Sequence, residues 1–167
     1  GGIAQALGRV ADCIDENDTM VVVLGDNIFE GVPMADVRLG KSNGCGAHIF
    51  LKKVPDPTRY GVADLRDGEL VGLVEKPKDP PTKLAVTGLY CYTSEVWGAI
   101  ADCKPSGRGE LEITDVNNWF LKRGRLRYSV LDGFWSDAGT WESRAEVEAW
   151  LREHPEFEAR VAANRRA

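Results

Sequence analysis

The sequence predicts a layered α/β fold, in which a mixed, mostly parallel sheet is flanked by helices and carries a β-hairpin insertion. An amphipathic helical stretch in residues 3–14 leads into the apolar residues 19–24, as in a parallel strand covered on both faces. Arg66-Asp67-Gly68-Glu69 separates two apolar runs, and Asp-Gly in that setting is a strong hairpin signal. With 167 residues, 43% of them hydrophobic, the chain can bury one ordinary core.

Composition and charge exclude several classes of protein. Because 26 acidic and 21 basic side chains give a net charge of -5, we expect no nucleic-acid partner. No apolar run approaches the roughly 18 residues of a membrane span and no basic, apolar leader opens the chain. We therefore expect a soluble, cytoplasmic protein without a membrane partner. Four cysteines without metal-ligand spacing and only two histidines leave catalysis to carboxylates, Lys, Arg or a hard cation.

The first half of the chain predicts a helix followed by strands. Apolar spacing predicts a helix over residues 3–14, ended by four polar residues, and then a strand over 19–24. Gly25-Asp26-Asn27 lies at the carboxyl end of that strand, where ligands bind in open α/β sheets. A helical or loop stretch is expected up to residue 43. After it we expect a strand over residues 47–54 and a turn at 56–57, followed by two hairpin strands over 62–65 and 70–74. A proline-rich loop over 76–81 and a strand over 84–92 complete this half.

The second half predicts three helices and one more strand. Ser94 is expected to cap a helix that ends near residue 101, and Gly124 to end the next helix. Thr140 is expected to cap the last helix. After residue 101 we expect a loop over residues 104–109, a helix over 110–123 and a strand over 125–131. A loop over 135–139 and a helix over 140–153 follow. We expect one domain over residues 1–153 and a charged tail over 154–167.

Two aspartates are the first candidates for chemistry. Asp26 lies at the end of a predicted strand, and Asp137 lies in a loop beside Trp135. Two carboxylates that converge from separate strand ends suit a Mg²⁺ ion that bridges substrate phosphates. The structural alternative is also open, because Gly-Asp-Asn is a common turn and Asp137 precedes a helix that Thr140 can cap.

Other polar residues suit a phosphorylated sugar. Glu75 and Lys76 end a predicted strand, where Lys can meet a phosphate and Glu can accept two hydroxyl hydrogen bonds. An exposed charged pair is the alternative. Arg108 stands between two glycines and can clamp a phosphate. Tyr60 and Gly61 can offer an aromatic wall and a bare backbone, or simply pack. Neither the P-loop pattern nor the dinucleotide-binding pattern occurs in the chain.

Six motifs in order resemble one family. They are Leu24-Gly25-Asp26-Asn27, Arg59-Tyr60-Gly61-Val62, Glu75-Lys76-Pro77, Val86-Thr87-Gly88-Leu89-Tyr90, Arg108-Gly109-Glu110-Leu111-Glu112-Ile113-Thr114-Asp115 and Trp135-Ser136-Asp137-Ala138-Gly139-Thr140. Together they resemble the sugar-1-phosphate nucleotidyltransferases, among them most closely the glucose-1-phosphate thymidylyltransferases. The resemblance runs from residue 2 to about residue 150.

The resemblance implies a Rossmann-like fold and a set of ligands. These are a nucleoside triphosphate such as dTTP, a sugar 1-phosphate such as glucose 1-phosphate, and Mg²⁺, with release of pyrophosphate and with homo-oligomer formation. It implies that Asp26 and Asp137 hold the metal and that Lys76 and Arg108 bind the sugar phosphate. The further substrate-binding residues that it implies are Gly2 against the base, Tyr60, Gly61, Glu75 and Val86 around the sugar, Trp135 as a wall of the site, and also Asn27 and Tyr90.

The chain also departs from the family. The glycine-rich signature that cradles the triphosphate is missing, and Ser136 and Ala138 stand where long bacterial thymidylyltransferases usually have Leu and Thr. We therefore expect only part of the site, an apolar surface on the strand over 19–24, and no catalysis by this chain alone. Two alternatives stay open: a metal-dependent glycosyltransferase of similar fold, and a non-catalytic module that binds a sugar phosphate or another subunit.

Overall fold

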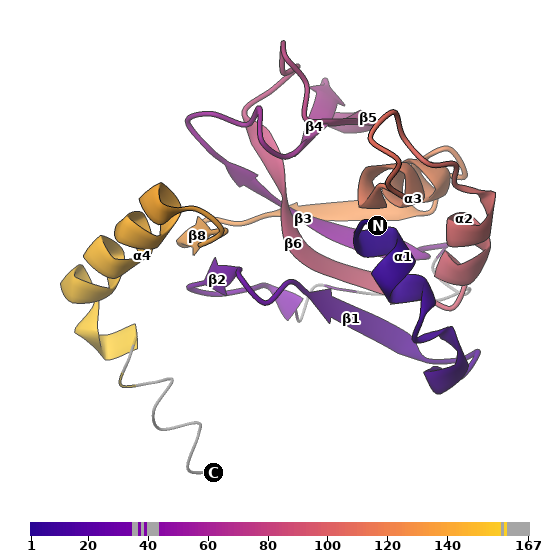
Figure 1. The fold of residues 1–167 in the computed structure, drawn as a ribbon, viewed down its shortest axis with the longest axis horizontal. Helices are drawn as coiled ribbons and strands as arrows, with labels where there is room; N and C mark the ends of the chain where they lie inside the picture. The colour runs from indigo at the N-terminus through magenta and orange to yellow at the C-terminus, as the bar shows by residue number, and fades with distance from the viewer. Residues whose placement is uncertain (35–36, 38, 40–43, 158, 160–167) are drawn as a thin grey trace.

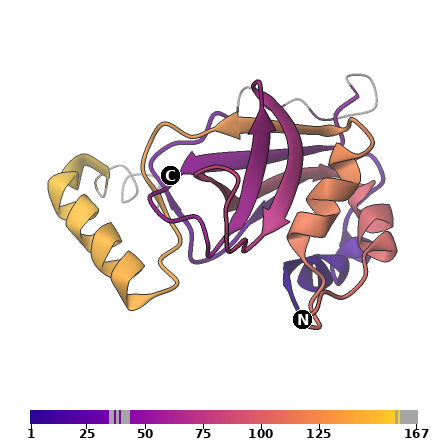
Figure 2. The same cartoon turned by 90° about the horizontal axis from the view of Figure 1, so that it is seen from above.

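The computed structural model describes residues 1–34, 37, 39, 44–157 and 159. The helical or loop stretch expected up to residue 43 lies partly outside the described residues, and the charged tail over 154–167 lies mostly outside them. Within this part of the chain, a six-stranded sheet is covered on one face by three helices, while a fourth helix projects away from the sheet (Figure 1, Figure 2).

Strand β6 lies at the centre of the large sheet. The strand order is β5-β4-β6-β3-β7, and β1 also pairs with β6. The bounds are β1 Thr19–Val23, β3 Ala47–Lys53, β4 Gly61–Arg66, β5 Glu69–Glu75, β6 Leu84–Thr93 and β7 Leu126–Val130. The predicted hairpin is confirmed, because Asp67 and Gly68 turn the chain between β4 and β5 with φ of 50° and 83°.

The sheet is mixed, as expected, but it is not mostly parallel. Among the strand pairs of the described residues, only β3 with β7 is parallel. A short connection explains one antiparallel pair, because a tight turn joins β4 directly to β5. The other antiparallel pairs place β6 against β1, β3 and β4, which lie far from it or are separated from it by β5 in the chain.

A second, very small sheet brings distant loops together. Strand β2, Ile28–Phe29, pairs antiparallel with β8, Trp135–Ser136. We expected a loop at β8, where long-range pairing instead makes a two-residue strand. Because Asp26 precedes β2 and Asp137 follows β8, this pairing brings the two aspartates to the same region.

Within the described residues, four helices with defined bounds accompany the sheets. They are α1 Ile3–Gly8, α2 Val96–Asp102, α3 Ile113–Leu121 and α4 Trp141–Glu153. The single helix expected over residues 3–14 is instead α1 followed by a 3-10 turn, Ala11–Cys13. The predicted cap of α4 is confirmed, because Thr140 and Ser143 form a reciprocal capping box. Gly124 follows α3 with φ of 67°, as expected for the residue that ends a helix.

The expected cap at Ser94 is wrong. Helix α2 begins after Glu95, which makes no side-chain capping bond. The Ser94 hydroxyl instead donates to the backbone oxygen of Glu16, at 2.6 Å. A partner distant in sequence thus takes the hydroxyl away from the helix end.

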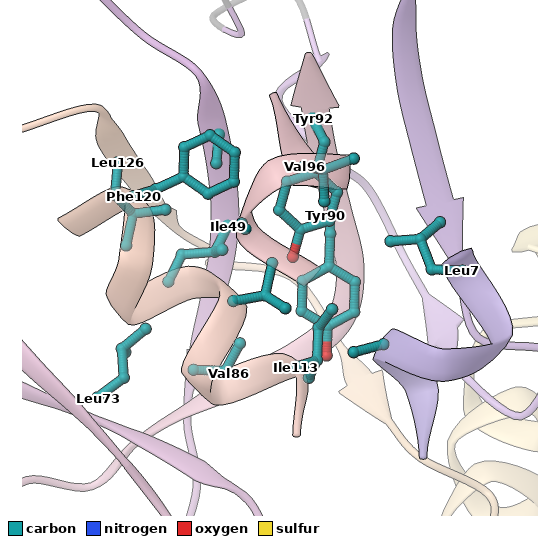
Figure 3. Packing of buried hydrophobic residues seen from close by; sticks show 14 of the residues in the cluster. Leu7, Ile49, Leu73, Val86, Tyr90, Tyr92, Val96, Ile113, Phe120 and Leu126 are labelled. Atoms are coloured by element: carbon teal, nitrogen blue, oxygen red, sulfur yellow. The ribbon is translucent and has the colours of Figure 1, made fainter. Parts of the chain in front are cut away.

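The main core lies between the sheet and helices α1 to α3. Leu7, Val96 and Phe120 of these helices pack against Ile49 and the stacked tyrosines of β6 (Figure 3). The fully buried Tyr92 donates its hydroxyl to Asn117 of α3, at 2.6 Å, so the buried polar group has a partner. The core holds β5, β6 and α3, and with them much of the pocket described below.

Strand β1 is covered on one face only. Met20 is buried, whereas Val21 and Val23 are 50% and 55% exposed. The expected cover on both faces is therefore wrong, and the expected apolar surface on this strand is confirmed. None of the helices in the described part of the chain is long and apolar enough to span a membrane.

Candidate functional site

A pocket opens where the ends of β1 and β5, the start of β4 and the middle of β6 meet β8 and the start of α3. Its volume is about 170 Å³, which is below the roughly 300–1,000 Å³ of pockets for drug-sized ligands. The predicted site residues that line it are Asp26, Asn27, Tyr60, Gly61, Glu75, Lys76, Val86, Tyr90, Trp135 and Asp137. Gly2 and Arg108 are the predicted site residues outside this lining.

Asn27 fixes the loop that carries Asp26. Its amide oxygen accepts hydrogen bonds from the Gly88 backbone at 2.9 Å and from the Trp135 indole at 2.7 Å. Its amide nitrogen donates to Asp26 Oδ1 at 2.8 Å. A Cβ on Gly88 would meet this amide at 2.6 Å, so glycine is needed there. The Asn27 side chain thus holds Asp26 in place.

The carboxylates of Asp26 and Asp137 converge on Gly139. A Cβ on Gly139 would lie 3.4 Å from Asp26 Oδ2 and 3.9 Å from Asp137 Oδ2. Asp137 Oδ2 accepts a 3.0 Å hydrogen bond from Arg59. Asp137 Oδ1 is buried and has no hydrogen-bond partner among the described residues. An unpartnered buried carboxylate oxygen beside a second carboxylate is a donor set that fits Mg²⁺.

Two carboxylates are sufficient for that ion. In the described part of the chain, no group of three or more His, Cys, Asp or Glu side chains gathers as a metal site. Mg²⁺ bound with a substrate commonly takes one or two protein carboxylates, and phosphate oxygens and water complete its shell. The residues present therefore fit a cation that arrives with a phosphorylated substrate.

Two tyrosines line the pocket as neutral hydrogen-bond donors. Burial, and then the charge of Asp137, raise the pKa of Tyr60 to about 12. Burial, followed by the charges of Glu75 and Asp26, raises the pKa of Tyr90 far above its ordinary value. Tyr60 also packs edge-on against Trp135, with ring centroids 5.3 Å apart. Both phenols therefore stay protonated at neutral pH.

Glu75 is held from two directions. Its Oε2 accepts a short hydrogen bond from the hydroxyl of Thr114, and its Oε1 lies 3.3 Å from the guanidinium of Arg108. Gly61 pairs with Glu75 across β4 and β5, and a Cβ on Gly61 would come within 2.9 Å of the Thr114 hydroxyl. The missing side chain at Gly61 therefore leaves this contact free to form.

Lys76 is held in an unusual backbone conformation. Its φ is 44°, a left-handed value that costs a non-glycine residue free energy, and its backbone N–H donates to Tyr60 O at 2.9 Å. Within the described residues, no carboxylate lies at ion-pair distance from its ammonium group. A strained lysine whose charge is not paired is a candidate for binding an anion.

Arg108 and Gly2 lie beside the pocket. Glu112 accepts from Arg108 with both carboxylate oxygens, at 2.9 and 3.0 Å. The hydrogen bond to Glu112 raises the pKa of Arg108. Burial of Glu112 acts to raise its pKa, but hydrogen bonds from Ser106 and Arg108 outweigh burial and the pKa is lowered. Gly2 has φ of 99° and lies against Leu111, whose oxygen a Cβ would meet at 2.6 Å.

Several lining residues had no predicted role. They are Ile3, Leu24, Arg59, Gly88, Ile113 and Thr114. Arg59 and Thr114 stand inside motifs that the sequence displays, directly before Tyr60 and directly after Ile113. Their polar side chains within these motifs could have marked them as site residues. Their partners, Asp137 and Glu75, are distant in sequence, so the contacts themselves could not be predicted.

Comparison with known proteins decides the family. Residues 1–154 match the family described as Nucleotidyl transferase. The chain belongs to this family. It is 38% identical over 157 residues to a glucose-1-phosphate thymidylyltransferase of Streptomyces griseus, and the aligned region covers 93% of this chain and 44% of that relative. It is 41% identical over 154 residues to the Mycolicibacterium smegmatis protein of the same name, with 90% of this chain and 53% of that relative covered.

Solved structures agree with the predicted fold. A Bacillus anthracis structure assigned as a glucose-1-phosphate thymidylyltransferase, in complex with sucrose, matches with a TM-score of 0.80 and 48% identity, covering 91% of this chain and 61% of that one. A UDP-glucose pyrophosphorylase in complex with UDP-glucose matches with a TM-score of 0.76 and 26% identity, covering 92% and 63%. The fold expected from the resemblance is confirmed. The chain spans about half the length of the curated relatives it matches.

Proposed function

We propose that this chain forms the sugar-phosphate side of a nucleotidyltransferase site that joins a nucleotidyl group, from dTTP, to glucose 1-phosphate and releases pyrophosphate. The observation that carries the proposal is that Asp26 and Asp137 converge in the same pocket as Glu75 and Lys76. The names of the thymidylyltransferase relatives support the choice of nucleotide and sugar.

The chemistry requires little beyond the placement of two anions. The phosphate oxygen of the sugar attacks the α-phosphate of the triphosphate, in line with departing pyrophosphate. The ammonium group of Lys76 offsets the charge of the sugar phosphate, and Arg108 adds a second cation beside Glu75. Glu75 accepts hydrogen bonds from sugar hydroxyls, while Thr114 keeps its carboxylate oriented. Val86, Tyr60 and Trp135 enclose the sugar.

Asp26 and Asp137 are the residues that would hold Mg²⁺. The bound ion would offset the negative charge that gathers between the two phosphate groups. Asn27 keeps Asp26 in position through its amide, and Gly139 leaves the space between the carboxylates open. The pairing of β2 with β8 keeps the two loops together.

The test is a product assay with the full-length protein. The protein is incubated with glucose 1-phosphate, Mg²⁺ and each nucleoside triphosphate in turn, and pyrophosphate is measured; dTTP is expected to give the highest rate. Free nucleoside diphosphate from a nucleotide sugar would indicate glycosyl transfer instead, and binding without any product would indicate a non-catalytic module.

Location and assembly belong to the same proposal. Cys13, Cys91 and Cys103 are free thiols, which supports a reducing, cytoplasmic compartment. The homo-oligomer implied by the family resemblance stays a prediction. Light scattering on the purified full-length protein would test it, and a monomeric mass would contradict it.

A further inference from the structure

Arg59 makes its ion pair inside the proposed cation site. Its Nη2 lies 3.0 Å from Oδ2 of Asp137, and its side chain is 46% exposed while that of Asp137 is 18% exposed. The guanidinium also lies over the ring of Tyr60, at 5.5 Å from the centroid. Arg59 is therefore tethered at the edge of the pocket rather than locked within it.

The oxygen that Arg59 contacts is the one that faces the second aspartate. Oδ2 of Asp26 and Oδ2 of Asp137 both lie next to Gly139. A divalent cation held by both aspartates would share the Asp137 carboxylate with the positive charge of the guanidinium. Like charges repel, so the ion pair and the cation would weaken one another at this carboxylate, whichever of its oxygens the cation contacts.

Other carboxylates lie near Arg59. It also lines a second pocket, on the side of the Asp137 loop toward α4, together with the carboxylates of Asp56, Glu142 and Glu146. These acids line the same pocket as Arg59 and so offer the guanidinium other partners.

We propose that Arg59 competes with the divalent cation for Asp137, pairing with this carboxylate in the absence of metal and leaving it when the cation binds. The inference rests on the proposed function, because it takes Asp26 and Asp137 as the cation ligands. It adds a role for Arg59 in setting cation affinity.

The experiment measures Mn²⁺ alone, in the absence of substrates, binding to the full-length protein by electron paramagnetic resonance. Arg59→Ala is expected to tighten Mn²⁺ binding by about two- to fivefold, the factor that corresponds to a partly exposed ion pair. Arg59→Lys keeps the charge and is expected to stay close to the parent protein. Arg66→Ala is the matched control, because it removes a 3.3 Å ion pair with Asp64 outside the site and should leave binding unchanged.

A second readout follows the side chain itself. The Nε–H signal of Arg59 in a nitrogen-15 NMR spectrum should shift when a diamagnetic divalent cation, Mg²⁺, is added, whereas the Arg66 signal should not. One pair of results would overturn the competition and leave the metal site intact. In that case Asp137→Asn abolishes Mn²⁺ binding, but Arg59→Ala leaves Mn²⁺ binding unchanged or weakens it. Mn²⁺ binding that survives both Asp26→Asn and Asp137→Asn would overturn the metal site and this inference together.

Discussion

The pocket has two sides that the fold builds in different ways. One side, here called the glutamate wall, comprises the lining residues Glu75 and Thr114 together with Arg108 and Glu112 beside the pocket. The carboxylates of Glu75 and Glu112 both accept hydrogen bonds from protein donors. The other, the aspartate wall, comprises Asp26 and Asp137 and includes a buried oxygen with no hydrogen-bond partner in the described part of the chain. The first wall is oriented by the protein itself, whereas the second has charge to offer to a ligand.

The difference follows from where each wall is attached. The glutamate wall stands on β5 and at the start of α3, and α3 is anchored in the core by Val116 and Phe120, both fully buried. The aspartate wall stands on loops beyond β1 and β8, joined by the two residue pairs of β2 and β8. A rigid wall can select the shape of a sugar, and a charged loop can adapt to a cation and phosphates.

The largest effect is expected from neutralising the aspartate wall. Asp26→Asn and Asp137→Asn should each lower pyrophosphate release by roughly 100-fold or more, because an amide lacks the charge that holds the cation. The melting temperature should change little, since neither carboxylate supports the core. Asp64→Asn on the hairpin is the control. Parent-like turnover of both variants at limiting Mg²⁺ would show that these aspartates do not hold the metal.

The next effect concerns Lys76, which lines the same pocket and has no ion-pair partner among the described residues. Lys76→Ala should raise the KM for glucose 1-phosphate about 10- to 100-fold, the range for losing a hydrogen bond to a charged group, and leave nucleotide affinity nearly unchanged. Lys78→Ala in the following loop is the matched control.

Lys76→Gly separates the charge of Lys76 from its backbone strain. It removes the same charge but relieves the φ of 44°, so it should lose sugar-phosphate binding equally while folding at least as stably as the alanine variant. A loss confined to nucleotide affinity in either variant would place Lys76 outside the sugar-phosphate site.

Local sequence signals predicted the elements whose partners lie nearby. Asp67-Gly68 predicted the hairpin because both residues tolerate positive φ, and Thr140 predicted its helix because its capping partner is three residues away. Ser94 failed for the opposite reason, since its partner Glu16 lies 78 positions earlier in the chain. The prediction of a mostly parallel sheet was wrong for a similar reason. Hydrophobic periodicity indicates which side chains are buried, but it does not indicate which strand pairs with which or in what direction.

The same limit applies to the site. The ordered motifs predicted which residues gather around the pocket, but they did not predict the contacts between motifs. Thr114 meets Glu75 across 39 positions, and Arg59 meets Asp137 across 78. Such pairs form only when the sheet assembles, so no local pattern in a single sequence contains them.

A smaller effect is expected from the glutamate wall. Glu75→Ala should lower the preference for glucose 1-phosphate over another hexose 1-phosphate, because this carboxylate meets hydroxyls and not the reacting phosphate. The ratio of kcat/KM for the two sugars measures it, and Glu69→Ala at the exposed start of β5 is the control. An unchanged ratio with equal losses for both sugars would mean that Glu75 supports the pocket without reading the sugar.

The smallest expected effect is a pH dependence of stability from the pair Glu112 and Arg108. Hydrogen bonds from Ser106 and Arg108 outweigh burial and lower the pKa of the Glu112 carboxyl in the folded protein, so these contacts stabilise the fold above the ordinary pKa of a glutamate, about 4.3. That stabilisation is lost as the pH falls through the lowered pKa, since the unfolded chain takes up the proton first. Glu112→Gln has no carboxyl to titrate, so its urea unfolding midpoint should fall less than that of the parent protein between pH 5 and pH 3, values chosen to span about that pKa. Parallel midpoints for both proteins across this range would show that the pair contributes nothing to the stability of the fold and serves only to orient Arg108 beside the pocket.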